Sequence, residues 1–252
     1  MRNLRLKLMY NGYAYHGWQI QNNAITVQGE LERVIEKIFG SHLTVYGCSR
    51  TDAGVHANEY YCNFRTDKDI KCEKVIAALN GNLPCDISVL ECKEMDIDFH
   101  SRFNCVSKQY VYRIWNSPVK NPFETHTAYH YKYKLDDVLL NKASKDYIGT
   151  YDYKAFCSSG SSVSDTVRTV KNVSVTRNGE MVEFRVEADG FLYNMVRIMV
   201  GTLININENK IDGNDIKKII LSGNRLNSGV TAPPQGLFLD KVNYGEDNDG
   251  ER

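Results

Sequence analysis

The sequence lacks the signals of membrane and secreted proteins. No apolar run approaches the ~20 residues that a membrane-spanning helix needs. The first residues alternate charged and apolar side chains, a pattern that does not fit a signal peptide. We therefore expect a cytoplasmic protein that makes no use of a membrane.

Cysteine and histidine are present, but without the spacing of a metal site or a disulfide framework. The 7 cysteines include no C-x-x-C pair, and no H-E-x-x-H occurs. His126 and His130 are four residues apart, but their surroundings are typical of a strand. We expect reduced, mostly buried thiols and no metal ion.

Motifs that hold phosphates or activate a serine are also missing. The chain has no G-x-x-x-x-G-K-[ST], no G-x-G-x-x-G after a strand and no G-x-S-x-G. These absences disfavour phosphotransferases, dinucleotide enzymes and serine hydrolases. We expect an activity without a cofactor.

The chain has no excess of charge of either sign, with 31 Lys and Arg against 31 Asp and Glu. This balance counts mildly against a nucleic-acid partner, since such proteins are often basic. It does not exclude one, because a groove needs only a local positive potential.

The chain does have the size and hydrophobic content of a globular protein. It has 252 residues, of which 42% are hydrophobic. Strand-like and helix-like patterns alternate along it, which predicts an α+β fold with mixed, mostly antiparallel sheets. The expected strands are 4–10, 58–64, 87–93, 109–115, 167–176, 181–186 and 237–242, and the expected helices are 27–38, 74–80, 136–148, 191–206 and 214–221. Thr26 can cap the first helix and Gly40 follows its end, and Asn178-Gly179 favours a hairpin turn between strands 167–176 and 181–186.

The order of these elements repeats, and it suggests two related halves. We expect an N-terminal half at 1–104, a C-terminal half at 105–245 and an acidic, disordered tail at 246–252. No residue-level repeat supports the relation between the halves.

The heptapeptide Arg50–His56 carries the chemistry most directly. A lone Asp in a loop usually forms an Asx-turn or caps a helix. Here Arg50 can hold the Asp52 carboxylate ionised, and Gly54 lets the backbone turn tightly near a ligand. A poised carboxylate on a loop suits a nucleophile or a general base.

Three further residues are candidates for contacts with a substrate. Tyr110 lies on an alternating strand, where it either packs across the sheet or stacks on a base. Arg197 is embedded in an apolar helix and needs a partner, either a structural ion pair or Asp52. Arg168 is a further basic candidate that we expect to contact substrate or solvent.

Taken together, these segments resemble the tRNA pseudouridine synthase A (TruA) family. The matching segments occur in the family's order and cover nearly the whole chain; they are Tyr10–Gly12, Tyr15–Gln19, Arg50–His56, Lys108–Tyr112, Val167–Thr169 and Phe191–Arg197. One departure is Ser49, which stands where many relatives have glycine and is still small.

The resemblance implies the pseudouridine synthase fold, with sheets flanked by helices around a central cleft. It implies a cofactor-free homodimer that isomerises uridine to pseudouridine at tRNA positions 38–40. Asp52 matches the catalytic aspartate and Tyr110 the tyrosine that contacts substrate. Arg50 and Arg197 match basic positions near the active site.

Two other classes of function stay open on the sequence alone. A non-catalytic RNA-binding module would need aromatic and basic surfaces but no poised aspartate. A small-molecule hydrolase would have no affinity for tRNA.

Overall fold

The computed structural model describes residues 1–160 and 163–245, and these fall into two compact units. The N-terminal unit is Met1–Val106 together with the last strand from Phe238 onward, and the C-terminal unit is Ser107–Leu237. The halves predicted from the sequence differ from these units in two places, because residues 105–106 and 238–245 both belong to the N-terminal unit. The relation between the halves remains a prediction. The expected acidic tail, 246–252, lies outside the described residues.

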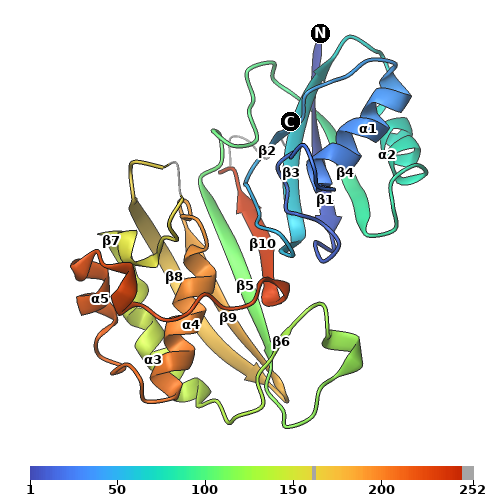
Figure 1. The fold of residues 1–252 in the computed structure, drawn as a ribbon. Helices are drawn as coiled ribbons and strands as arrows, with labels where there is room; N and C mark the ends of the chain where they lie inside the picture. Colours follow the sequence, from blue (N-terminus) through green and yellow to red (C-terminus); the bar gives the residue numbers. More distant parts are fainter. Residues whose placement is uncertain (161–162, 246–252) are drawn as a thin grey trace. The chain divides into compact units, whose positions relative to one another are not determined.

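The N-terminal unit is one sheet with two helices (Figure 1). Its strands are β1 (Arg2–Tyr10), β2 (Tyr46–Gly47), β3 (His56–Thr66), β4 (Ile87–Met95) and β10 (Leu237–Asn243). The order across the sheet is β4-β1-β3-β10, with β2 beside β3. All pairs are antiparallel except β3 with β10, which is parallel.

Helices α1 (Val27–Phe39) and α2 (Cys72–Asn80) lie together on one face of this sheet (Figure 1). Helix α1 begins and ends as its sequence predicts. The Thr26 side chain accepts a hydrogen bond from the amide of Gly29, and Gly40 ends the helix with a φ of 75°.

Alternation along β1 separates its two faces. Leu4, Leu6 and Leu8 are fully buried on one face and form the core of the unit. Arg5 is buried on the other face, where it pairs with Glu91 at 3.3 Å and lies 5.0 Å from the ring centre of Tyr61. The buried cation is thus compensated by a carboxylate and an aromatic face.

The strands of the C-terminal unit are also paired largely antiparallel. Its strands are β5 (Ser107–Trp115), β6 (Tyr129–His130), β7 (Gly149–Asp152), β8 (Val167–Asn178) and β9 (Met181–Ala188). The order is β5-β9-β8-β7, and β6 pairs with β5 in parallel. The expected α+β class with mixed, mostly antiparallel sheets is confirmed.

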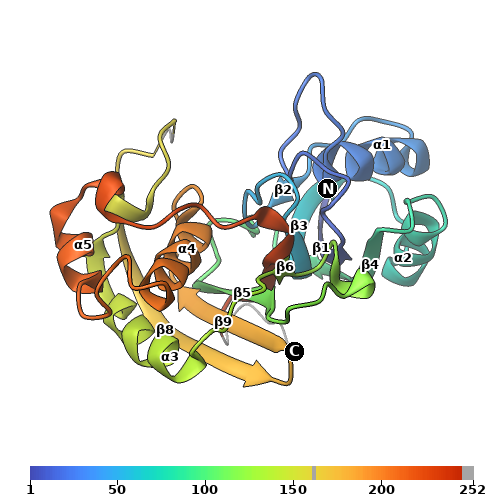
Figure 2. The ribbon, with the colours of Figure 1, turned by 60° about the horizontal axis from the view of Figure 1, so that its bottom comes forward.

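The helices of this unit are α3 (Asp137–Ser144), α4 (Met195–Asn207) and α5 (Ile216–Ser222). Helices α3 and α4 cover one face of β8 and β9 (Figures 1 and 2). The strand β9 alternates strictly between buried and half-buried residues, as expected for a sheet covered on one face.

Two predictions about this unit need correction in detail. The hairpin of β8 and β9 turns at Gly179–Glu180, one residue later than predicted; Gly179 has a φ of 57°, which suits the first position of a type II′ turn. Helix α4 begins at Met195 rather than Phe191, because Asn194 has a left-handed φ of 61° that interrupts a right-handed helix.

None of the seven cysteines, all of which lie in the described residues, forms a disulfide, and Cys48, Cys62 and Cys92 are buried. Burial raises the pKa of the Cys62 thiol, so this group stays protonated and unreactive at neutral pH. In the described part of the chain, no helix combines the length and apolar character that a membrane crossing requires.

Candidate active site

Asp52 lies at the start of a tight turn in the loop between β2 and β3. We name residues Cys48–Val55 the Asp52 loop. The amide of Val55 donates to the carbonyl of Asp52 at 3.1 Å, and Gly54 has a φ of 76°. Those two features define a type II turn with glycine at its third position. The tight turn predicted at Gly54 is confirmed, and Asp52 itself is half-buried.

The segment between β1 and α1 holds this loop through its backbone. The amide of Trp18 donates to the carbonyl of Thr51 at 3.1 Å, and the amide of Gly54 donates to the carbonyl of Tyr15 at 3.1 Å. The amide of Gly12 donates to Nδ1 of His56 at 3.0 Å. Two of the sequence segments that carry the family resemblance therefore pack directly against a third.

Side chains of the core complete the support. The hydroxyls of Tyr10 and Thr51 are 2.9 Å apart in a buried pair, and the Tyr60 hydroxyl donates to the carbonyl of Ser49. Tyr60 stacks on Trp18 with ring centres 4.1 Å apart. The backbone on either side of Asp52 is thus fixed by buried groups.

Glycine is required where these segments meet. A Cβ on Gly12 would lie 1.9 Å from the carbonyl oxygen of Val55, and one on Gly17 would lie 2.5 Å from that of Thr51. Both neighbours are backbone atoms, which cannot move aside as a flexible side chain can. Gly17 also has a φ of 91°, a conformation that other residues rarely adopt.

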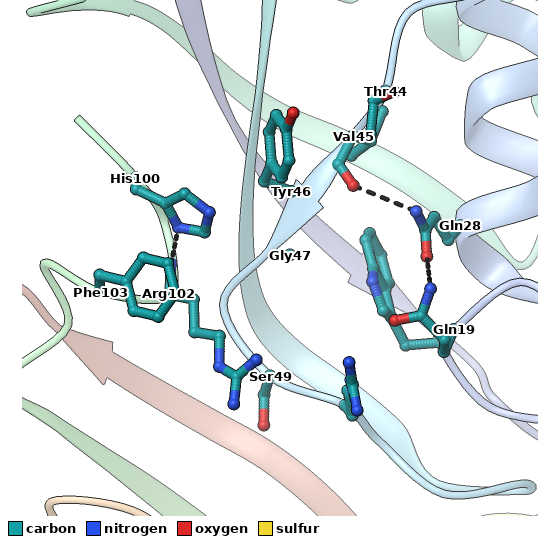
Figure 3. A pocket seen from close by; sticks show the side chains of 12 residues that line it. Gln19, Gln28, Thr44, Val45, Tyr46, Gly47, Ser49, His100, Arg102 and Phe103 are labelled. Atoms are coloured by element: carbon teal, nitrogen blue, oxygen red, sulfur yellow. Dashed lines mark hydrogen bonds between the residues drawn. The ribbon is translucent and has the colours of Figure 1, made fainter. Parts of the chain in front are cut away.

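Arg50 is exposed on the same loop and lines a pocket of about 260 Å³ within the N-terminal unit (Figure 3). The other lining residues come from positions 44 to 49, from Trp18, Gln19 and Gln28, and from His100, Arg102 and Phe103. Sequence reasoning missed this pocket. Its aromatic and basic residues are scattered over four segments and have no common spacing.

The remaining predicted site residues belong to the C-terminal unit, where one short segment contacts all three. We name Gly190–Asn194 the Gly190 segment. The ring of Phe191 packs edge-on against the buried ring of Tyr110, with centres 4.9 Å apart. The Arg168 side chain lies against Gly190, and Arg197 donates to Oδ1 of Asn194 at 2.6 Å.

Arg197 is satisfied in part by neutral acceptors. Besides Asn194, its Nε donates to the carbonyl of Ala232 at 2.7 Å. The predicted partners of Arg197 were charged groups, so these two contacts with neutral groups were not expected. The predicted pairing with Asp52 joins residues of different units and stays a prediction.

Arg168 is oriented by backbone carbonyls at the start of β8. Its Nη1 donates to the carbonyls of Asp165, at 3.1 Å, and Val167. The Arg168 side chain is half-buried. Its contact with substrate stays a prediction.

The paired histidines of the sequence analysis do not form a cluster that could hold a metal. His130 Nε2 lies 2.8 Å from the carbonyl of Ser117. Within residues 1–160 and 163–245, no three His, Cys, Asp or Glu side chains are grouped in the way a metal ion requires.

Comparison with known proteins decides the family. The sequence model described as tRNA pseudouridine synthase matches residues 8–104 and 143–245. The chain belongs to the tRNA pseudouridine synthase family. The first matched region contains the whole Asp52 loop, and the second contains Arg168, the Gly190 segment and Arg197.

Curated relatives match over nearly their entire length. The tRNA pseudouridine synthase A of Acetivibrio thermocellus is 45% identical over 244 residues, which cover 97% of this chain and 100% of the relative. The tRNA pseudouridine synthase A of Thermoanaerobacter sp. is 43% identical with the same coverage. The tRNA pseudouridine synthase A 2 of Clostridium tetani is 44% identical over 245 residues, with 96% and 99% covered.

Proposed function

We propose that this protein isomerises uridine to pseudouridine at positions 38–40 of the tRNA anticodon stem-loop, with Asp52 as its catalytic nucleophile. Family membership supports the reaction class. The single structural observation that carries the assignment of Asp52 is its place on a turn fixed by backbone bonds and buried hydroxyls. Such fixation is what a preorganised catalytic group requires.

The reaction needs no atom or electron from outside the substrate. The N1–C1′ bond breaks, the uracil rotates, C5 joins C1′, and the C5 proton leaves while N1 gains one. An ionised Asp52 can attack the sugar, attack the base or remove a proton on the way to a glycal. Each route requires the carboxylate close to the target nucleoside, which must leave the helical stack to reach it.

The other site residues take supporting roles in this proposal. Tyr110 contacts the target base, either as a stacking platform or as the group that accepts the C5 proton. Arg50 guides the flipped nucleotide or fills the space that it leaves. Arg168 and Arg197 contact the substrate, and the enzyme acts as a cytoplasmic homodimer without a cofactor.

The direct test is to incubate the protein with an unmodified tRNA transcript and to map pseudouridine by position. We expect modification at positions 38–40 and release of tritium from a transcript labelled at uridine C5. Asp52→Asn and Asp52→Ala should lower the rate by at least about a thousandfold, as for loss of a catalytic group. Binding of tRNA should survive in both variants.

Two outcomes would contradict the proposal in different ways. Normal turnover by Asp52→Asn would remove Asp52 from the chemistry. Tight tRNA binding by the wild type without any pseudouridine would favour the non-catalytic RNA-binding module. Tyr110→Phe separates the two roles of Tyr110, since it keeps the ring and loses the hydroxyl; full activity would leave only the stacking role.

A further inference from the structure

The pocket beside Arg50 has the chemistry of a nucleotide-binding site. We name it the Arg102 pocket; its volume is about 260 Å³, and all of its lining residues belong to the N-terminal unit. That volume lies just below the usual range of roughly 300–1,000 Å³ for ligand sites, which suits one nucleotide rather than a larger molecule. Four observations point to an unstacked RNA nucleotide as its occupant.

The first observation is a row of aromatic rings along one side. Tyr46 and His100 have ring centres 5.1 Å apart, and His100 and Phe103 have centres 4.4 Å apart. Figure 3 shows these three rings on the side of the pocket opposite Gln19 and Gln28. Phe103 is 76% exposed and Tyr46 is 41% exposed. Exposed rings of this kind are costly in water and offer a base a surface on which to stack.

The second observation is positive charge that has no carboxylate partner; the guanidinium of Arg102 lies 5.7 Å from the ring centre of Phe103. Across the part of the chain that the structure describes, neither Arg50 nor Arg102 takes part in an ion pair, whereas Arg2, Arg5 and Arg33 of the same unit all do. No carboxylate side chain is among the described residues that line the pocket. A guanidinium group left without a carboxylate partner is suited to bind a phosphate.

The third observation is that His100 is neutral at physiological pH. Burial, helped by the nearby charges of Arg102 and Arg65, lowers the pKa of His100 below its ordinary value. Its Nδ1 accepts a hydrogen bond from the amide of Arg102 at 3.0 Å, so the ring proton is on Nε2. The pocket therefore presents a flat ring on which a base can stack, with an Nε2 donor at the edge of that ring.

The fourth observation is a fixed amide at the opposite wall. Gln28 is buried, and its Nε2 donates to Glu32 at 2.9 Å and to the carbonyl of Val45 at 3.1 Å. Its oxygen must then be the acceptor for Nε2 of Gln19, at 3.0 Å. This chain orients the exposed Gln19 amide, whose oxygen and second N–H can read the edge of a base.

We infer that the Arg102 pocket binds a second unpaired nucleotide of the RNA substrate, with its base against Tyr46, His100 and Phe103 and its phosphate on Arg102. This inference rests on the proposed function, because it takes the RNA to be the tRNA substrate. The pocket shares Ser49 and Arg50 with the Asp52 loop. A nucleotide bound there would anchor the RNA next to the catalytic loop and favour a substrate whose loop bases are already unstacked.

The test compares RNA binding by full-length variants at several salt concentrations. The probes are an anticodon stem-loop RNA and a fully paired duplex of equal length. Phe103→Ala should weaken stem-loop binding about 5- to 150-fold, the range for losing one base–aromatic stack, and leave duplex binding unchanged. Arg102→Ala should reduce the salt dependence by about one phosphate contact.

Matched controls come from residues of similar exposure elsewhere. Phe123 is 91% exposed in the C-terminal unit, and Arg33 is exposed in the N-terminal unit but pairs with Glu30 at 2.7 Å. Phe123→Ala and Arg33→Ala should bind both RNAs as the wild type does. Because Phe103 and Arg102 are exposed, their substitution leaves the core intact, and circular dichroism checks the fold.

A cross-link locates the nucleotide independently of any variant. Stem-loop RNA carrying 4-thiouridine at single loop positions is irradiated with the wild-type protein, and the modified peptides are sequenced. We expect one loop position to cross-link within residues 44–50 or 100–103. Cross-links confined to other segments, together with unchanged binding by Phe103→Ala, would overturn the inference.

The two proposals fail separately in this design. If the wild type forms no pseudouridine but Phe103→Ala loses stem-loop binding, the proposed function is wrong and the pocket stands. If pseudouridine forms normally and the pocket variants bind like the wild type, the function stands and the pocket inference is wrong.

Discussion

The Asp52 loop and the Gly190 segment are both tight turns that carry site residues, but they are held in different ways. Backbone atoms and buried hydroxyls fix the Asp52 loop, and its neighbours approach so closely that only glycine fits at positions 12 and 17. The Gly190 segment is held by one backbone bond to a distant segment, from the amide of Ser158 to the carbonyl of Tyr193 at 3.1 Å, and by side chains, through the amide of Asn194 and the ring of Phe191. The Asp52 loop is therefore held in one position and tolerates few substitutions. The Gly190 segment can adjust, because side chains move more easily than backbone.

The largest expected difference comes from adding one methyl group to a glycine in each region. Gly12→Ala places a Cβ 1.9 Å from a backbone oxygen, whereas Gly190→Ala places one 3.2 Å from Nε of the flexible Arg168 side chain. We expect Gly12→Ala to lower the free energy of unfolding by about 3 kcal/mol or more, as severe overpacking does. Gly190→Ala should cost less than about 1 kcal/mol. Urea denaturation measures both.

These two glycines form a fair pair, because neither has a positive φ. A difference between them therefore reports contacts rather than backbone strain. Equal losses for the two variants would refute the distinction between a rigid and an adjustable region.

The second prediction concerns Asn194, the main fixing point of the Gly190 segment. Asn194→Ala removes the hydrogen bonds to Arg197 and Ser158 and leaves alanine at a φ of 61°. We expect a loss of about 2 kcal/mol in the free energy of unfolding, from lost bonds and left-handed strain together. Thermal or urea unfolding gives the value.

Two controls divide that loss into its causes. Asn194→Gly removes the same bonds without the strain and should recover about 1 kcal/mol. Asn209→Ala tests the strain alone at an exposed position with a φ of 57°. If Asn194→Ala costs no more than Asn209→Ala, the side-chain bonds contribute nothing.

A third comparison uses two pairs of hydroxyls, one in each unit. Thr51 lies 2.9 Å from the Tyr10 hydroxyl and is buried, whereas Thr150 lies 3.0 Å from the Thr169 hydroxyl and is exposed. Thr51→Val leaves a buried hydroxyl with one bond fewer and should cost about 1–2 kcal/mol of stability. Thr150→Val should change stability by less than about 0.5 kcal/mol, since water replaces the lost partner.

Thr51→Val should also slow pseudouridine formation, because Thr51 adjoins Asp52 on the loop. The expected sign is a lower kcat with little change in KM, and Thr150→Val should have neither effect. A change in KM alone would show that Thr51 affects binding rather than the placement of Asp52.

The smallest expected effect is a change in how the free energy of unfolding varies with pH in the acid range. The hydrogen bond from Arg177 lowers the pKa of Asp137 in the C-terminal unit, and that from Arg2 lowers the pKa of Glu94 in the N-terminal unit. A lowered folded-state pKa adds stability above the unfolded pKa, about 4 for a carboxyl group. That stability is lost as the pH falls through the folded value.

Asp137→Asn should therefore flatten the acid side of the stability curve, by less than about 1 kcal/mol for a partly exposed pair. The Glu94 side chain is 50% exposed against 31% for Asp137, so Glu94→Gln should flatten it less. Urea midpoints measured between pH 3 and pH 7 give the comparison. A larger effect for Glu94→Gln would reverse this ranking.

Local patterns were enough to predict most elements of the fold. The cap at Thr26, the stop at Gly40 and the alternation of β1 depend only on nearby residues, and each was predicted correctly. The start of α4 was not, because the left-handed Asn194 is held by Ser158, far away in the sequence. The short strands β2 and β7 were missed because two to four residues carry no periodicity.

The sequence was enough to predict which residues are candidates for the site, but not which groups they contact. Gly54 lies two residues after Asp52, and this spacing predicts a tight turn that begins at Asp52, as observed. The neutral partners of Arg197 could not be foreseen, since a backbone carbonyl such as that of Ala232 has no sequence signature. The same holds for the Arg102 pocket, whose walls meet only in the folded N-terminal unit.

The parallel pairing of β3 with β10 has a consequence for the order in which the protein is built. His56 pairs with Phe238, so the edge of the N-terminal sheet next to β3 is completed by almost the last residues of the chain. The C-terminal unit is continuous and emerges in full from the ribosome before that strand does. Until then the start of β3, at His56 and Ala57, presents an open edge, the kind of surface that invites wrong pairing. The unit that carries the Asp52 loop is therefore the first to be started and the last to be finished.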